Sequence, residues 1–271
     1  MASTTDDDLV ARIGRARIID LGQPLHADMP QPPGLPRFSL ALLRRHGDVL
    51  REGGYSAAHD LLITLNHAGT HIDALGHISV HGRLFGDVAA DDIQRGTGGL
   101  GELGIQAMAP IVGRAVLADV PRHLGIAALE PAFGIDGALL EATLSGQGQV
   151  LQKGDVLLVR TGWGAWWSDP ERYLGRAAGL PGVNADGAAW LADRGALATG
   201  ADCLMYEAFD PRHNALPVHS LLIQGRGIAL IENLDLEELA AAAIDRAFTI
   251  VVLPLKLVGA TGSQVRPIAI V

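Results

Sequence analysis

The chain has 271 residues, of which 48% are hydrophobic and 19% are charged, so it can bury a sizeable core and is not disordered. Its single cysteine, Cys203, excludes an internal disulfide framework and any multi-cysteine metal site. The formal net charge of −9 argues against nucleic acid as a partner, because proteins that bind the phosphate backbone cluster Lys and Arg.

The N-terminal residues MASTTDDDLVARIG carry three consecutive aspartates where a signal peptide would carry basic and then apolar residues. We expect residues 1–15 to form an N-terminal extension or arm. No stretch reaches the roughly 18 apolar residues that a membrane helix requires. We therefore expect a cytoplasmic protein that makes no contact with membranes.

Short apolar runs typical of β-strands alternate with helical patterns along the chain. The predicted strands are Ala16–Leu21, Asp60–Leu65, Ile111–Val120, Asp155–Thr161, Ala196–Cys203, Gly227–Ile231 and Phe248–Leu255. The predicted helices are Asn184–Arg194 with Asn184 as its cap, Leu234–Ile244, and a short helix at Val218–Gln224. This alternation predicts an α/β or α+β fold with a mixed sheet. Because no linker divides the chain, we expect a single domain over residues 1–271.

Three histidines and an aspartate lie within eleven residues, at His67, His71, Asp73 and His77. Imidazole and carboxylate groups are ligands of zinc, manganese and iron. In one extended strand His67 and Asp73 would lie about 20 Å apart, and in one helix Asp73 would point away from the histidines. The chain must therefore bend between the ligands, and Gly69 permits that bend. We expect the cluster at the end of strand Asp60–Leu65, a position typical of sites in open α/β sheets.

Other motifs compete with this cluster. Gly96, Gly98 and Gly101 match the G-x-G-x-x-G pattern, but a dinucleotide-binding loop follows a buried strand, and here the preceding residues are polar. We expect a plain loop, with a nucleotide-binding enzyme as the less favoured alternative. The HExxH zinc motif is excluded because Ala68 follows His67. The tryptophans at 163, 166 and 167 are expected to pack internally, with a substrate pocket or subunit contact as the alternative.

The segment His67–His77, HAGTHIDALGH, resembles H-x-G-T-H-x-D-x-P-x-H, the signature of the cyclase family of metal-dependent hydrolases. That family includes bacterial kynurenine formamidase and isatin hydrolase. Further segments resemble later or earlier family blocks in the same order: Ile18–Leu25, Gly154–Trp163, Gly200–Asp202, Pro217–His219, Glu232–Leu234, Pro254–Leu255, Gly259–Ser263 and Arg266–Ala269. The resemblance implies a swivelling β/β/α fold with a mixed sheet, assembled as a homodimer or homotetramer.

The resemblance also implies five metal ligands, namely His67, His71, Asp73, His219 and Glu232. The first three would hold one ion, and His219 and Glu232 would complete a second site in which Asp73 and Glu232 bridge. His77 would be the general acid and base. The cofactor would be Zn²⁺ or Mn²⁺, as one or two ions. The reaction would be hydrolysis of an amide, cyclic amide, imide or lactone of a small molecule by metal-activated water.

Two departures from the family pattern bear on these expectations. Leu75 stands where the family has proline, so we expect a looser turn before His77. Segment 28–34 lacks the tryptophan that kynurenine formamidases place against their substrate, which argues against that particular activity. Asp20 and Asp202 are candidates to orient the ligand histidines, with ordinary turn positions as the alternative. A metal-binding family member without turnover is the main alternative function.

Overall fold

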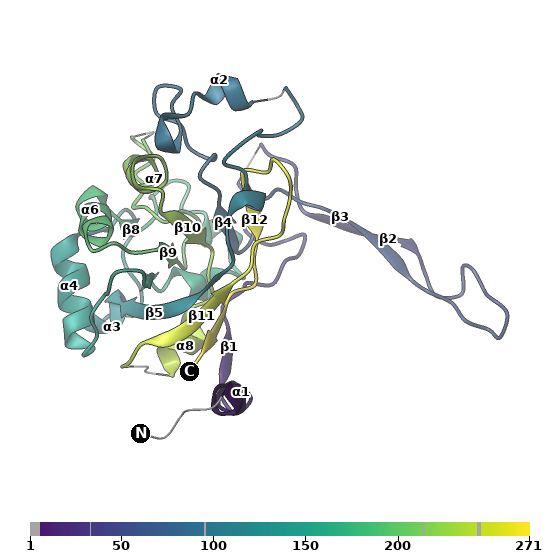
Figure 1. The fold of residues 1–271 in the computed structure, drawn as a ribbon, viewed down its shortest axis with the longest axis horizontal. Coiled ribbons are helices and arrows are strands. Elements are labelled where there is room, and N and C mark those ends of the chain that lie inside the picture. Colours follow the sequence, from purple (N-terminus) through teal and green to yellow (C-terminus); the bar gives the residue numbers. More distant parts are fainter. Residues whose placement is uncertain (1–5, 33, 95, 214, 243–244) are drawn as a thin grey trace.

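A nine-stranded mixed β-sheet forms the centre of the molecule (Figure 1). The computed structural model describes residues 6–32, 34–94, 96–213, 215–242 and 245–271. The strands, in their order across the sheet, are β1 (Ile18–Asp20), β13 (Ile268–Ile270), β11 (Phe248–Val252), β5 (Ile111–Asp119), β7 (Val156–Arg160), β9 (Ala198–Ala201), β10 (Ala229–Glu232), β4 (His71–Asp73) and β12 (Gly262–Gln264). Strands β5, β7, β9 and β10 run parallel, and the outer strands pair antiparallel. The predicted mixed sheet is thus confirmed.

Both faces of the central strands are buried, which explains their continuous apolar sequences. In β7, Leu157 and Val159 belong to one core while Val156 and Leu158 belong to another on the opposite face. The first core includes residues of α4 (Gly137–Gly146) and α6 (Ala185–Asp193). The second is closed in part by Leu239 of α8 (Glu237–Ala241). The sheet is therefore a central layer that packs against one hydrophobic core on each of its faces.

The remaining helices are short. They are α1 (Asp6–Ile13), α2 (Ala90–Ile93), α3 (Val120–Leu124), α5 (Pro170–Tyr173), α7 (Pro217–His219), the 3₁₀ turns Phe85–Asp87, Ile105–Ala107 and Trp163–Trp166, and the π-helical turn Ser220–Gly225. The predicted cap of α6 is confirmed, because Asn184 accepts a hydrogen bond from the backbone N–H of Gly187. The predicted helix Leu234–Ile244 is shorter than expected, and residues 243–244 lie outside the described residues. Among the described residues, no helix has the length and apolar character needed to span a membrane.

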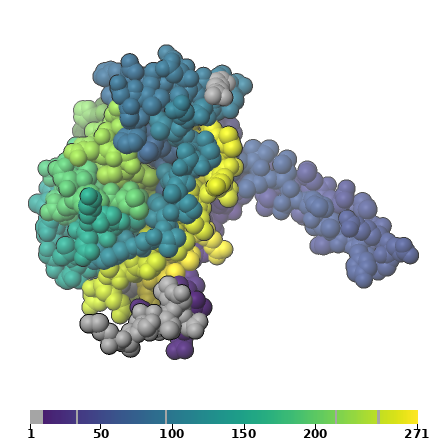
Figure 2. Space-filling view, viewed as in Figure 1, coloured from purple at the N-terminus to yellow at the C-terminus, as the bar shows by residue number. Residues whose placement is uncertain are grey.

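The predicted strand Asp60–Leu65 forms, but it lies outside the central sheet. As β3 (His59–Ile63) it pairs only with β2 (Ser39–Arg44) in a two-stranded hairpin. This hairpin projects away from the rest of the molecule (Figures 1 and 2). The expectation that this strand would carry the site at its end within an open sheet was therefore wrong. Two members of the cluster, His71 and Asp73, lie instead on β4, whose three residues are too few to show an alternating pattern in the sequence.

The carboxyl ends of β7 and β9 are held together by Asp202. Its Oδ1 accepts hydrogen bonds from the N–H and the hydroxyl of Thr161 at 2.7 Å each, and its Oδ2 accepts from the N–H of Gly162 at 2.9 Å. Burial raises the pKa of Asp202, while the donors of Thr161 and Gly162 oppose that rise. Asp202 thus satisfies buried backbone donors where two parallel strands end.

Replacing Asp202 by Ala leaves these buried donors without partners, so we expect the free energy of unfolding to fall by about 2–4 kcal/mol. Urea denaturation in the presence of a chelator measures this change without a contribution from bound metal. The exposed Asp193, which pairs with Arg226 at 3.0 Å, provides a control whose replacement by Ala should change stability by less than about 0.5 kcal/mol. Equal urea midpoints for Asp202→Ala and the unmodified chain would contradict this role.

Candidate metal centre

The cluster is built on the pairing of β4 with β10. His71 and Asp73 are two residues apart on β4, so their side chains leave the same face of the sheet. Glu232, the last residue of β10, is the register partner of His71. Antiparallel register partners also share a face. The sheet therefore places Glu232 beside His71, with 3.3 Å between its Oε2 and the histidine Nε2.

His67 reaches this group from the turn that precedes β4. Gly69 has a φ of +68°, so the predicted bend of the chain at this residue is confirmed. His67 Nδ1 lies 2.8 Å from Asp73 Oδ1, and its Nε2 lies 2.8 Å from the hydroxyl of Thr261. Gly262 on β12 allows this approach, because a Cβ there would lie 2.7 Å from the His67 ring.

His71 is oriented by its backbone surroundings. Its Nδ1–H donates to the carbonyl oxygen of Gly69 at 2.8 Å, which directs Nε2 towards the carboxylates. Asn233 Nδ2 donates to the same carbonyl at 3.0 Å. A histidine whose second nitrogen is fixed in this way has the tautomer and ring orientation of a metal ligand.

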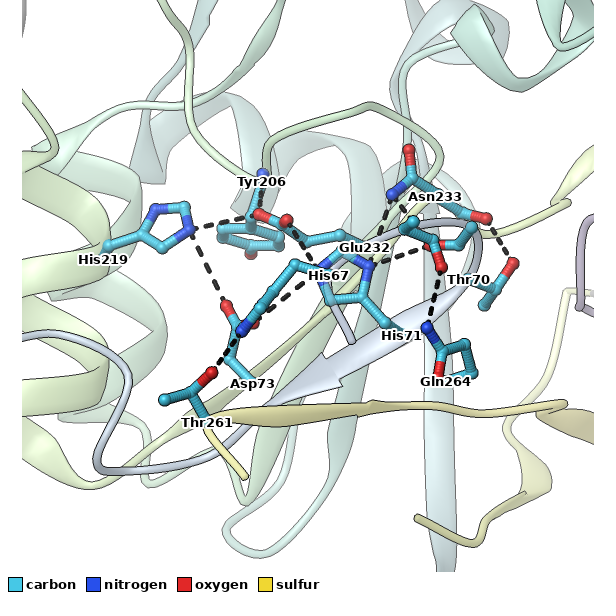
Figure 3. Close-up of polar contacts among 12 residues, drawn as sticks. His67, Thr70, His71, Asp73, Tyr206, His219, Glu232, Asn233, Thr261 and Gln264 are labelled. Atoms are coloured by element: carbon cyan, nitrogen blue, oxygen red, sulfur yellow. Dashed lines mark hydrogen bonds and ion pairs between the residues drawn. The ribbon is translucent and has the colours of Figure 1, made fainter. Parts of the chain in front are cut away.

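His219, on the short helix α7, completes the group from the opposite side (Figure 3). Its Nε2 lies 3.2 Å from Glu232 Oε1 and 3.8 Å from Asp73 Oδ2. Its Nδ1–H donates to Glu207 Oε1 at 2.5 Å. Glu207 is fully buried and also accepts hydrogen bonds from the backbone N–H groups of Val218 and His219. This carboxylate thus fixes the ring of His219.

The structure brings all five predicted ligands together in two overlapping groups. Each group places its donor atoms within 4.8 Å of one another: His67, His71 and Asp73 in one, and Asp73, His219 and Glu232 in the other. Asp73 belongs to both groups. Its Oδ2 is buried and has no hydrogen-bond partner among the described residues. A buried carboxylate oxygen without a donor, surrounded by imidazoles, fits a divalent cation, so this donor set can hold a metal ion.

The pKa shifts of the residues in the cluster show that positive charge is stabilised there. Burial lowers the pKa of His219, but the hydrogen bonds to Glu207 and Glu232 outweigh burial and raise it to about 10. Burial likewise opposes a charged His71, whose pKa is nevertheless raised by Glu232 and Asp73. Burial disfavours ionised Glu232, yet His219 and His71 hold its pKa below the usual range. Without metal, the buried carboxylates therefore favour the protonated forms of His71 and His219.

His77 lies beside the donors without joining either group. Its ring stacks on that of His67 with 4.1 Å between centroids, and the centroid of the His219 ring is 6.4 Å away. Burial lowers the pKa of His77, and the charges of His67 and His219 lower it further. Asp73 and Glu232 oppose this shift without reversing it. His77 is therefore neutral at pH 7 and has the capacity to accept a proton.

The turn before His77 is closed although Leu75 replaces the family proline. The N–H of His77 donates to the carbonyl of Ala74 at 3.0 Å, and Leu75 packs against the core that contains α4 and α6. A hydrogen bond thus closes this turn, and Leu75 adds apolar contacts with the core.

The two aspartates considered as orienting residues make other contacts. Asp20 pairs with Arg266, and Asp202 bonds to Thr161 and Gly162. Glu207 occupies that role, and sequence reasoning missed it. No local motif marks Glu207, which lies 12 residues before His219 in an irregular segment. The sequence offers one signal for this residue: Glu207 is a lone charged residue in the apolar stretch CLMYEAF, and a buried carboxylate needs a partner.

The competing motifs have structural roles. Gly96 and Gly99 have positive φ values in a turn, and a bridge between Gln94 and Leu100 closes the described part of that loop. The loop follows the short helix α2 instead of a strand, so it lacks the context of a dinucleotide site. Trp163 and Trp167 are buried, as expected for packing residues, whereas Trp166 is half-buried.

Comparisons with known proteins show which family this fold and sequence resemble. The Cyclase family model matches residues 19–208. Cyclase-like protein 3 of Oryza sativa subsp. japonica is 30% identical over 269 residues, which cover 95% of this chain and 81% of that protein. The crystal structure of a novel cyclase is similar, with a TM-score of 0.87 and 27% identity over 98% of this chain and 93% of that chain. Isatin hydrolase A from Ralstonia solanacearum shares the fold, with a TM-score of 0.75, 23% identity and full coverage of both chains. The chain belongs to the cyclase family.

Proposed function

We propose that this protein is a metal-dependent hydrolase that cleaves an amide, cyclic amide, imide or lactone bond of a small molecule. The observation that carries this proposal is the donor set around Asp73 Oδ2, which has no hydrogen-bond partner among the described residues, with the ring of His77 stacked on His67 beside it. Isatin hydrolase, a protein of the same fold, is named for cleaving a cyclic amide. A binding site without turnover would have no need of an unligated histidine next to its donors.

The residues would hold the metal as two sites that share Asp73. His67 and His71 complete the first site, and His219 and Glu232 complete the second. Imidazole and carboxylate donors suit Zn²⁺ and Mn²⁺, and we propose one or two ions of either kind. When bound, such an ion supplies a water of lowered pKa and polarises a carbonyl oxygen.

His77 would move the protons of the reaction. As a neutral imidazole it accepts a proton from the attacking water at a ring nitrogen. The imidazolium formed then donates that proton to the leaving nitrogen or oxygen. Stacking against His67 holds the ring next to the donor set throughout. His71 and His219 keep their Nε2 atoms directed inwards through the hydrogen bonds of Nδ1 to Gly69 and Glu207.

The proposal is tested by metal analysis of the purified protein together with a hydrolysis screen of N-formylkynurenine, isatin, cyclic imides and lactones. We expect near-stoichiometric zinc or manganese and a turnover that stops when the metal is removed. His71→Ala should lose both metal and activity, because it removes a donor that lies within reach of Asp73 and Glu232. Bound metal without turnover would contradict the hydrolase assignment, and full activity of the metal-free protein would contradict the metal's role.

His77→Gln separates proton transfer from metal binding. We expect the metal content to stay unchanged and kcat to fall by roughly 10²–10⁴-fold, because the variant cannot transfer a proton. His123→Gln, at an exposed histidine on α3, is the matched control and should retain the kcat of the unmodified enzyme. A His77→Gln enzyme with unaltered kcat, or one that loses its metal, would show that this histidine has another role.

Glu207→Gln tests the orientation of His219. The amide keeps the shape of the side chain but replaces one acceptor oxygen by a donor group, which then faces either the N–H of Val218 or the N–H groups of His219. We expect the dissociation constant of the second metal ion to rise about 10–100-fold, as is usual for outer-shell partners of ligand histidines. Competition with a coloured chelator measures it, with the exposed Glu141→Gln as control. Equal affinities in a folded Glu207→Gln protein would contradict the assignment.

A further inference from the structure

Two arginines of this chain stack on tryptophan rings, and they differ in what their N–H groups meet. Cζ of Arg194 lies 4.1 Å from the centroid of the Trp190 ring, and its Nη2 donates to Glu141 at 2.6 Å. Cζ of Arg172 lies 3.5 Å from the centroid of the Trp166 ring. Among the described residues, no carboxylate forms an ion pair with Arg172. The stack of Arg172 therefore lacks the acceptor that Glu141 provides to Arg194.

Stacking leaves the N–H groups of a guanidinium free at the edge of its plane. These groups form a planar fork whose geometry matches a carboxylate with two parallel hydrogen bonds. A ring against one face of the guanidinium also holds that plane in position, so less conformational freedom is lost when an anion binds. Arg172 is exposed, so its N–H groups are accessible to an anion from solution.

Arg172 and Trp166 line two hollows, which adjoin because they share both residues. Their volumes are about 780 and 550 Å³, within the roughly 300–1,000 Å³ of small-molecule sites. The first hollow is also lined by Trp163. The second reaches Asp119 and Arg160, the register partners at the carboxyl ends of β5 and β7. Ligands of open α/β sheets bind beyond such strand ends, and none of the five predicted metal ligands lines either hollow.

The charged groups that line the hollows are four arginines and four carboxylates. Arg160 pairs with Asp119 and Glu237 at 2.9 Å each, so these three groups are occupied. The other five are Arg122, Glu130, Glu171, Arg172 and Arg176. Within the described part of the chain, none of these five forms an ion pair. A ligand therefore meets three free arginines and two free glutamates, which favour one negative charge and disfavour several.

We propose that Arg172 and Trp166 form a binding site for a small aromatic monocarboxylate. Its carboxylate would take the place at Arg172 that Glu141 occupies at Arg194. Its ring would lie against the aromatic wall made by Trp163 and Trp166, whose ring centroids are 4.9 Å apart. The site is additional to the metal centre and has its own ligand class.

Calorimetric titration of the full chain with benzoate, a flat monocarboxylate, tests this site. We expect benzoate to bind, and to bind equally after metal has been removed with a chelator. Arg172→Gln should weaken binding at least about tenfold, because a hydrogen-bonded charge pair is lost. Arg194→Gln removes the arginine of the other stack, whose acceptor is Glu141, and should keep the affinity within about twofold. Both arginines are exposed, so both variants should fold.

Further probes separate the charge from the ring. Benzamide keeps the ring without the charge, and inorganic phosphate has charge without a ring, so each should bind at least about tenfold more weakly than benzoate. Benzoate should also change the tryptophan fluorescence of the unmodified chain, and this change should shrink in Trp166→Leu.

Three results would overturn the proposal: no binding of benzoate, loss of its binding when metal is removed, or equal weakening in the two arginine variants. The second result would place the carboxylate on a metal ion. Phosphate that binds as tightly as benzoate would overturn the assigned ligand class, since the site would then recognise charge alone.

Discussion

The site depends on the burial of three carboxylates whose ion-pair partners, in the described part of the chain, are histidines. Asp73, Glu207 and Glu232 are each no more than 5% exposed. Removing a carboxylate from water costs several kcal/mol unless positive charge lies close by. The fold meets that cost with protonated imidazoles, as the raised pKa values of His71 and His219 show. A divalent cation would meet the same demand with the charge of two protonated imidazoles and without needing those protons.

The mixed sheet is what concentrates these groups. Strand β10 pairs parallel with β9 on one side and antiparallel with β4 on the other. Glu232 therefore ends the parallel part of the sheet directly beside His71 and Asp73 of an antiparallel strand. Here three of the five donors lie on strands whose register is fixed, which positions them more exactly than loops would.

The sequence reveals those parts of this arrangement that leave a local pattern. The apolar runs of β5, β7 and β9 and the cap of α6 were predictable because burial on both faces and a capping Asn act within a few residues. The donors from His67 to Asp73 were predictable because they cluster around Gly69. The three-residue strand β4 and the contact of Glu207 with His219 were not, since both arise from tertiary pairing. Family resemblance, and no spacing rule, pointed to His219 and Glu232.

The hairpin shows a different limit of sequence reasoning. Its apolar run predicted a strand, and the strand exists, but every residue of that strand is exposed in this chain, so the apolar pattern did not predict burial. The hairpin is also joined directly to the site. Strand β3 ends four residues before His67, and Gln264, the register partner of His71, donates to the carbonyl of Leu65 between them. The contact of Gln264 with Leu65 thus ties the base of the hairpin to the segment that delivers His67 to the site.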